Sequence, residues 1–168
     1  MKENSVNSNL NFPAQLSRYP DDENRRWEIV DDLYAKSVRA ADPPKSDEVI
    51  RVDPTTAVCR STEKKNDCAE CGPVYRLVPH GQICVATGLI FVTLEEASSY
   101  DQLEEAFKAV GFTIEEQSPT GGFWLRHKSG SIKSALENYL AVSKLKQVKT
   151  TEPQFLSQRV GKRGKRRF

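Results

Sequence analysis

The sequence predicts an α+β fold in which two helices cover one face of a four-stranded antiparallel sheet. Three observations support this prediction: an apolar run at 89–94, two capped amphipathic helices, and a pair of short strands between those helices. Together they give the order strand, helix, strand, strand, helix, strand over residues 86–160.

The first strand and the first helix have clear boundaries. Residues 89–94 form a β-branched apolar run that follows Gly88 and precedes acidic residues, which is typical of a strand. Ser99 and Gln102 form a capping-box pattern, and Gly111 supplies a left-handed stop. The apolar residues between these signals recur at helical spacing: Leu103, Ala106, Phe107 and Val110.

A hairpin and a second helix follow. The alternating segment 112–116 and the run 123–126 are separated by the Pro/Gly-rich residues 118–122, which predicts an antiparallel pair with a loop longer than two residues. Ser131 can cap the second helix, and residues 148–151 form the last strand. The apolar face of that helix consists of Ile132, Ala135, Leu136, Tyr139 and Leu140.

Both faces of the predicted sheet carry apolar side chains. Leu89 and Phe91 alternate with Ile90 and Val92, while the helices can cover one face alone. A second apolar face suggests a docking surface. The candidate residues for this surface are Phe91, Phe123 and Trp124.

Four pieces of the chain, in order, resemble the propeptide domains of subtilisin-like serine proteases. They are residues 87–92, the helix at 103–111, the segment 122–126 and the exit at 152–155. The resemblance covers roughly residues 86–160, about half of the chain. It implies a ferredoxin-like βαββαβ fold, in a family whose free-standing members are protease inhibitors.

The resemblance also implies how such a protein acts. The open sheet face would pack on two surface helices of the protease, and the extended C-terminal tail would lie in the substrate cleft like a cleaved product. An extended strand can pair with the edges of such a cleft. The implied tail consists of Glu152, Pro153, Gln154, Phe155, Leu156, Ser157, Gln158 and Arg159, with 156–159 nearest the scissile position.

The chain continues past the usual end of such a propeptide into a basic tail. The basic residues of 161–168 are Lys162, Arg163, Lys165, Arg166 and Arg167. Six of the 25 basic residues follow Gln158 and no acidic residue does, which leaves 19 basic and 23 acidic residues before them, net −4. The segment 163–166 fits the dibasic preference of kexin- and furin-like proteases. The alternative function is an interaction adaptor whose basic tail binds nucleic acid or another acidic partner.

The rest of the chain predicts appendages to one modest domain. Residues 1–20 are expected to be flexible, residues 21–57 to form a helical arm and linker, and residues 58–85 to form a cysteine-containing hairpin segment. Within them, 22–40 has near-helical apolar spacing, 48–52 is a candidate edge strand, and 74–78 can pair with 83–87.

The sequence leaves the state of its four cysteines open. Cys59, Cys68, Cys71 and Cys84 follow a C-x8-C-x2-C-x12-C spacing. Four thiolates can form a structural zinc site, two disulfides can form in an exported protein, and the thiols can stay unpaired. No cofactor is required, and zinc would serve folding.

The sequence predicts a protein without catalytic residues. The sequence has two histidines, His80 and His127, and no Gly-x-Ser-x-Gly elbow, so few residues are available to form a hydrolase triad. No apolar run suggests a signal peptide or a membrane span, so a cytoplasmic location is expected, with non-classical export left open. The expected function is binding of a subtilisin-like protease as inhibitor, folding chaperone or both.

Overall fold

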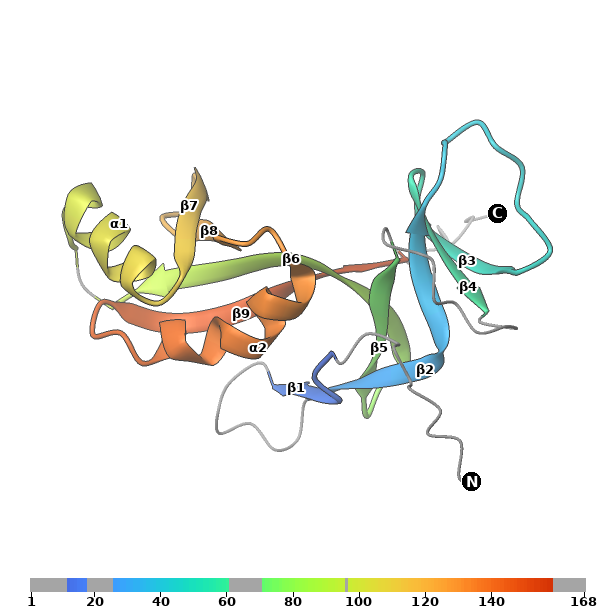
Figure 1. Ribbon diagram of the computed structural model, residues 1–168, viewed down its shortest axis with the longest axis horizontal. Coiled ribbons are helices and arrows are strands. Elements are labelled where there is room, and N and C mark those ends of the chain that lie inside the picture. Colours follow the sequence, from blue (N-terminus) through green and yellow to red (C-terminus); the bar gives the residue numbers. More distant parts are fainter. Residues whose placement is uncertain (1–11, 18–25, 61–70, 96, 159–168) are drawn as a thin grey trace, which may run out of the picture.

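A computed structural model of the chain describes residues 12–17, 26–60, 71–95 and 97–158. These residues form nine strands, all paired antiparallel in one sheet, and two helices (Figure 1). The strands are β1 Gln15–Ser17, β2 Arg26–Ser37, β3 Glu48–Asp53, β4 Thr56–Arg60, β5 Gly72–Val78, β6 Gln82–Leu94, β7 Phe112–Gln117, β8 Phe123–His127 and β9 Val148–Ser157. The helices are α1 Tyr100–Ala109 and α2 Ile132–Ser143.

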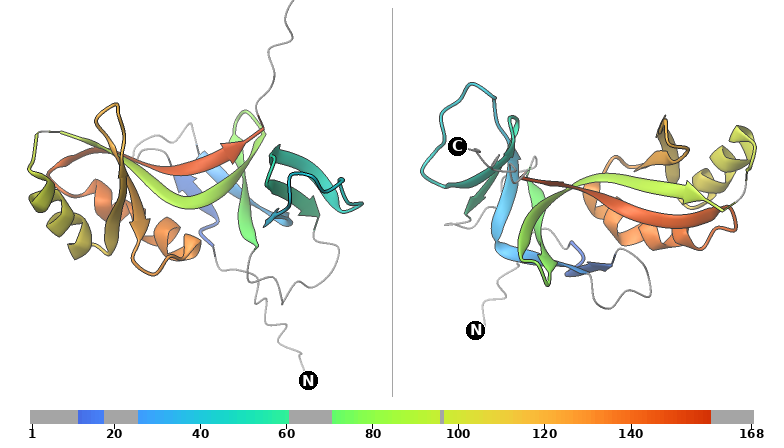
Figure 2. Two further views of the ribbon diagram at one scale, coloured as in Figure 1. Left: turned by 90° about the horizontal axis from the view of Figure 1, so that it is seen from above. Right: turned by 180° about the vertical axis from the view of Figure 1, so that it is seen from behind.

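The predicted fold class is wrong, because the four expected strands are part of a larger sheet. The sheet has the order β3-β4-β2-β5-β6-β8-β7, with β9 on β6 and β1 on β2. The long strand β6 is the reason. Its first part pairs with β5 and its second part with β8, while β9 pairs along its other edge (Figure 2). Two helices on a nine-stranded antiparallel sheet are not a four-stranded ferredoxin-like fold.

The local elements of the second half lie where the sequence predicts them. Helix α1 has the predicted capping box, in which Ser99 Oγ accepts from Gln102 N at 3.4 Å and Gln102 Oε1 accepts from Ser99 N at 3.4 Å. Ser131 caps α2, accepting from Ser134 N at 3.2 Å. The hairpin β7–β8 and the hairpin β5–β6 are also confirmed.

The predicted helical arm is wrong, because residues 26–37 form strand β2. This strand pairs with β1, β4 and β5, and its register on β5 shifts between Ile29 and Tyr34. The shift breaks the strict alternation of a strand and produces the apolar spacing that resembles a helix. Trp27 packs on one core cluster and Leu33 on another, which a single helix face could not achieve.

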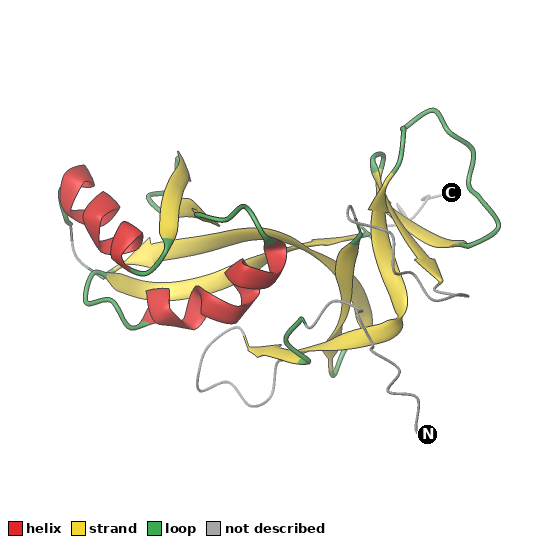
Figure 3. Cartoon of the chain, viewed as in Figure 1, coloured by secondary structure: helices red, strands yellow, loops and turns green. Residues whose placement is uncertain are grey.

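The two helices cover one end of the sheet, and the other end consists of strands and loops (Figure 3). Under the helices lies the largest core cluster, which includes Ile90, Leu125, Phe107 and Tyr139. A second cluster around Val58, Val74 and Val85 fills the all-strand end. Strands β6 and β9 run through both ends and contribute residues to both clusters.

Candidate protein-binding surface

The sheet face opposite the helices carries an aromatic patch, formed by Leu89, Phe91 and Trp124. Ile90 and Leu125 point to the helices, so their neighbours along β6 and β8 point the other way. Phe91 and Trp124 are register partners, and their ring centroids are 4.6 Å apart at an interplanar angle of 49°. All three residues of the patch are half-buried. The patch therefore presents apolar area that no helix of the described structure covers.

Gly122 fixes the position of the patch because the Phe91 ring lies directly on it. A Cβ atom at Gly122 would stand 2.3 Å from Phe91 Cζ and 2.7 Å from the backbone oxygen of Val92. The ring could turn away, but the backbone oxygen belongs to a paired strand. A larger residue cannot enter here without moving β6 or β8.

Gly122→Ala is expected to lower the free energy of unfolding by about 2 kcal/mol, as overpacking of a close-packed site does. The matched control is Gly72→Ala, whose new Cβ would meet nothing closer than 3.8 Å. That change should leave stability unchanged or raise it by up to about 1 kcal/mol. Urea unfolding of both variants measures the difference, and equal stabilities would contradict the close contact.

A polar rim surrounds the aromatic patch. Arg126 donates to both carboxylate oxygens of Glu115 at 3.1 and 3.2 Å, and this pairing lowers the pKa of Glu115. On the β9 side, the hydroxyls of Thr93 and Thr150 are 2.5 Å apart. An apolar centre with a hydrogen-bonded border is the composition of a protein-binding surface.

Phe123, the third predicted docking residue, lies on the other face. It is 4% exposed and belongs to the core cluster under the helices. Neighbouring residues of a strand point to opposite faces, so Phe123 and Trp124 cannot share one. Leu89 takes its place in the patch, at the same alternation as Phe91.

The predicted cleft-binding tail differs most from the expectation, because residues 152–157 form the second half of β9. Pro153 lies opposite Ile90, and Phe155 lies opposite Ala86. Phe155 stacks on Trp27, with centroids 4.5 Å apart and planes at 21°, and meets the Tyr75 ring edge-on at 5.7 Å. The segment is not a released tail, since its side chains complete the core.

Some of the remaining tail residues lie in the part of the chain that the structure describes, and others lie outside it. Gln154 Oε1 pairs with the Thr87 hydroxyl at 2.7 Å, Leu156 packs on the second core cluster, and Gln158 is exposed. Arg159 and the basic residues Lys162, Arg163, Lys165, Arg166 and Arg167 lie outside the described residues.

Three of the four candidate zinc ligands, Cys59, Cys71 and Cys84, lie in the described part of the chain, where they do not form one group. Cys59 in β4 and Cys84 in β6 are free, buried thiols. Strands β2 and β5 lie between them, which separates them by roughly 14 Å at the usual strand spacing. Cys71 is disulfide-bonded, and Cys68 lies outside the described residues. Within the described part of the chain, no three Cys, His, Asp or Glu side chains form a group suited to a metal ion.

Cys84 is expected to resist alkylation in the folded protein. Burial raises its pKa to about 11, so roughly one thiol in a thousand is ionised at pH 8. Burial also raises the pKa of Cys59, against the opposing effect of Lys36. Peptide mapping after iodoacetamide treatment should find Cys59 and Cys84 unmodified under native conditions and modified in denaturant. Modification at equal rates in both conditions would contradict their burial.

Comparison with models of known protein families, with curated proteins and with solved structures found no match to this chain. No helix in the described ranges is long and apolar enough to span a membrane.

Proposed function

We propose that this protein is a non-catalytic partner of a subtilisin-like serine protease, which it binds as inhibitor, folding chaperone or both. The aromatic patch is the observation that carries the proposal. It lies in the part of the chain whose sequence resembles protease propeptides, and on the sheet face that those propeptides turn toward the enzyme. Aromatic residues at the centre of a surface with a polar rim, as Phe91 and Trp124 are here, typically contribute most of the free energy of protein–protein binding.

The part of the chain that enters the cleft is shifted in this proposal. Because β9 holds residues 152–157 in the sheet, the segment that reaches the substrate cleft begins after Ser157. This segment includes Arg159 and the pairs Lys162-Arg163 and Lys165-Arg166. The acidic pockets of dibasic-specific subtilases would accept such side chains. The preferred target is therefore a protease that cleaves after paired basic residues.

Inhibition of a panel of subtilisin-like proteases, with a dibasic-specific member, tests the proposal. The full chain should inhibit at micromolar concentration or below, and Trp124→Ala should weaken binding at least about tenfold, as for a central aromatic anchor. Leu140→Ala is the matched control, since this residue is a 40% exposed apolar side chain on α2. Its loss should change binding by less than about twofold.

A chain ending at Gln158 separates the contribution of the aromatic patch from that of the residues after Gln158. It should still bind the protease through the patch but inhibit more weakly. Absence of binding to every protease of the panel by the full chain would overturn the proposal. If Leu140→Ala and Trp124→Ala weakened protease binding equally, the aromatic patch would have no specific part in that binding.

The second candidate function is an adaptor that binds nucleic acid or another acidic partner through the basic tail. The observation that favours it is the charge distribution, with six basic and no acidic residues after Gln158 and a net charge of −4 before. Such binding would fall steeply with salt and vanish in the chain ending at Gln158. Protease binding through the patch would depend on salt only weakly.

A further inference from the structure

A cavity of about 380 Å³ lies between the end of β2, the loop that follows it and the start of β3. Four basic residues line this cavity: Lys36, Arg39, Lys45 and Arg51. Two acidic residues, Asp42 and Glu48, also line it. The residues that line the cavity belong to β2, β3 and the loop between them, which lie in the all-strand end of the sheet, away from helices α1 and α2 (Figure 1).

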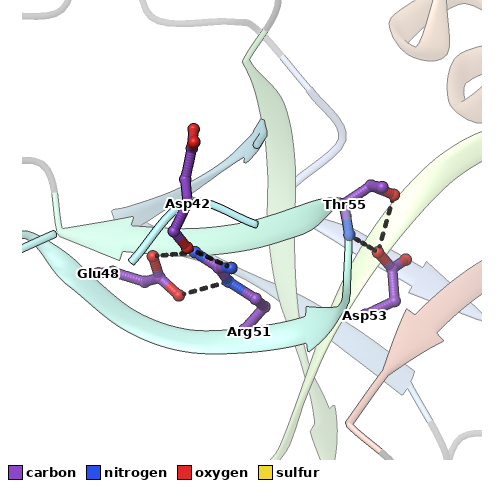
Figure 4. A network of polar contacts seen from close by, with 5 residues as sticks. All are labelled: Asp42, Glu48, Arg51, Asp53 and Thr55. Carbon is purple, nitrogen blue, oxygen red and sulfur yellow. Dashed lines mark hydrogen bonds and ion pairs between the residues drawn. The ribbon is translucent and has the colours of Figure 1, made fainter. Parts of the chain in front are cut away.

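Arg51 is held in place by Glu48 (Figure 4). Its Nε and Nη2 donate to the two carboxylate oxygens of Glu48 at 2.9 and 3.0 Å, and its Nη1 donates to the backbone oxygen of Asp42 at 3.1 Å. The Glu48 side chain is only 5% exposed. The guanidinium lowers the pKa of Glu48, so both groups stay charged at neutral pH. Three of five guanidinium donors are used by these bonds, which leaves two for a ligand.

The other cations differ in whether they have a counter-charge. Lys36 Nζ pairs with Asp47 at 3.3 Å. Arg39 and Lys45 make no ion pair with any residue in the described ranges, and both are exposed. The carboxylate of Asp42 points away from the Arg51–Glu48 pair (Figure 4). The lining therefore contains two cations, Arg39 and Lys45, and one carboxylate, Asp42, that form no ion pair in the described ranges. They lie next to Arg51, which has two donors left.

We propose that this cavity binds the phosphate group of a small phosphate monoester, with Arg39 and Lys45 as counter-charges and the free donors of Arg51 as hydrogen-bond partners. The cavity volume lies within the range of small-molecule sites. Val38 and Pro43 provide apolar lining for the organic part of the ligand.

The number of hydrogen-bond donors favours a phosphate over a carboxylate. A phosphate monoester carries about −1.5 to −2 charges at pH 7 and three acceptor oxygens. Counted with Asp47, the lining carries a net charge of +1, because Asp42 offsets one of the two cations that form no ion pair. Arg39, Lys45 and the free donors of Arg51 together can contact three oxygens, which a phosphate offers and a carboxylate does not. Fixed guanidinium donors also suit the several oxygens of a phosphate.

Calorimetric titration of the full chain with glucose 6-phosphate tests the proposal, with glucuronate and glucose as carboxylate and neutral counterparts. Saturable binding of glucose 6-phosphate is expected, at least about tenfold tighter than that of glucuronate, because two charge-assisted contacts replace one. Glucose should not bind. Inorganic phosphate should compete, which attributes binding to the phosphate group. Equal affinity for glucuronate, or no saturable binding at about 5 mM ligand, would overturn the proposal.

The double variant Arg39→Gln/Lys45→Gln locates the site. It should weaken binding at least about tenfold, while circular dichroism confirms its fold. The matched control, Lys146→Gln/Lys149→Gln, removes the same charge from two exposed positions at the helix-covered end. It should change affinity by less than about twofold, since distant surface charges are screened by salt. Equal losses in the two double variants would show that net charge alone is responsible and would overturn the proposal.

Discussion

A chain that ends at Thr151 is expected to be unfolded, whereas a chain that ends at Gln158 should keep its structure. The shorter chain loses the half of β9 that carries Pro153, Phe155 and Leu156, of which the last two pack on different core clusters. Loss of two such side chains costs about 5 kcal/mol or more. That is comparable to the whole stability of a domain of this size.

Far-UV circular dichroism and urea unfolding measure this difference. The chain ending at Gln158 is the control, because it lacks the undescribed C-terminal residues but retains all of β9. A cooperative unfolding transition in the Thr151 chain at the stability of the control would contradict the role of β9. The outcome also governs functional experiments: loss of protease inhibition in the Thr151 chain would report unfolding, not removal of a tail.

Phe155→Ala is expected to lower the free energy of unfolding by about 2 kcal/mol, because the change removes a large, half-buried side chain that packs on the core cluster under the helices. The ring stacks on Trp27 in β2 and meets Tyr75 in β5, so it joins the last strand to two strands of the all-strand end. Its removal takes away the contacts by which β9 packs on those two strands.

Phe155→Leu is the matched control, since it keeps most of the buried volume and loses the ring contacts. It should cost about 1 kcal/mol, the range of aromatic pair interactions. Urea unfolding of both variants gives the two values. A cost below about 1 kcal/mol for Phe155→Ala would show that the residue does not hold β9 to the sheet.

Local signals in the sequence predicted the elements whose boundaries depend on neighbouring residues. The capping box at Ser99 and the Ser131 cap were sufficient to place both helices, and the Pro/Gly-rich segment 118–122 placed the β7–β8 hairpin. Hydrogen bonds and backbone angles within a few residues determine such features, so they are readable without the rest of the chain.

The parts that were missed depend on partners far away in the sequence. The segment 22–40 has helical spacing, yet pairing with β4 and β5 makes residues 26–37 a strand. Residues 152–157 read as an exit from the sheet because an acidic residue, a proline and an aromatic residue in this order (Glu152, Pro153 and Phe155) suggest a strand end. Trp27 and Tyr75, which hold Phe155, come from strands more than seventy residues earlier in the chain.

The candidate surface was predictable in part. The alternation along β6 identified Phe91. The sequence named both Phe123 and Trp124 as docking residues and did not decide between them. Which of Phe123 and Trp124 faces outward depends on the register between β6 and β8, which pairs Phe91 with Trp124. Gly122 had a local signal, the Gly121–Gly122 pair before β8, but its close contact with Phe91 depends on the packing of β6.

The length of β6 couples the unfolding of the two ends of the sheet. One strand of 13 residues, paired with β9 from Cys84 to Leu94, belongs to both core clusters. Neither end can open alone without breaking hydrogen bonds that also secure the other, so slowly exchanging amides should extend along all of β6 and vanish together. A partner bound over Phe91 would therefore protect the Cys84 end of β6 from unfolding as strongly as it protects the residues that it contacts.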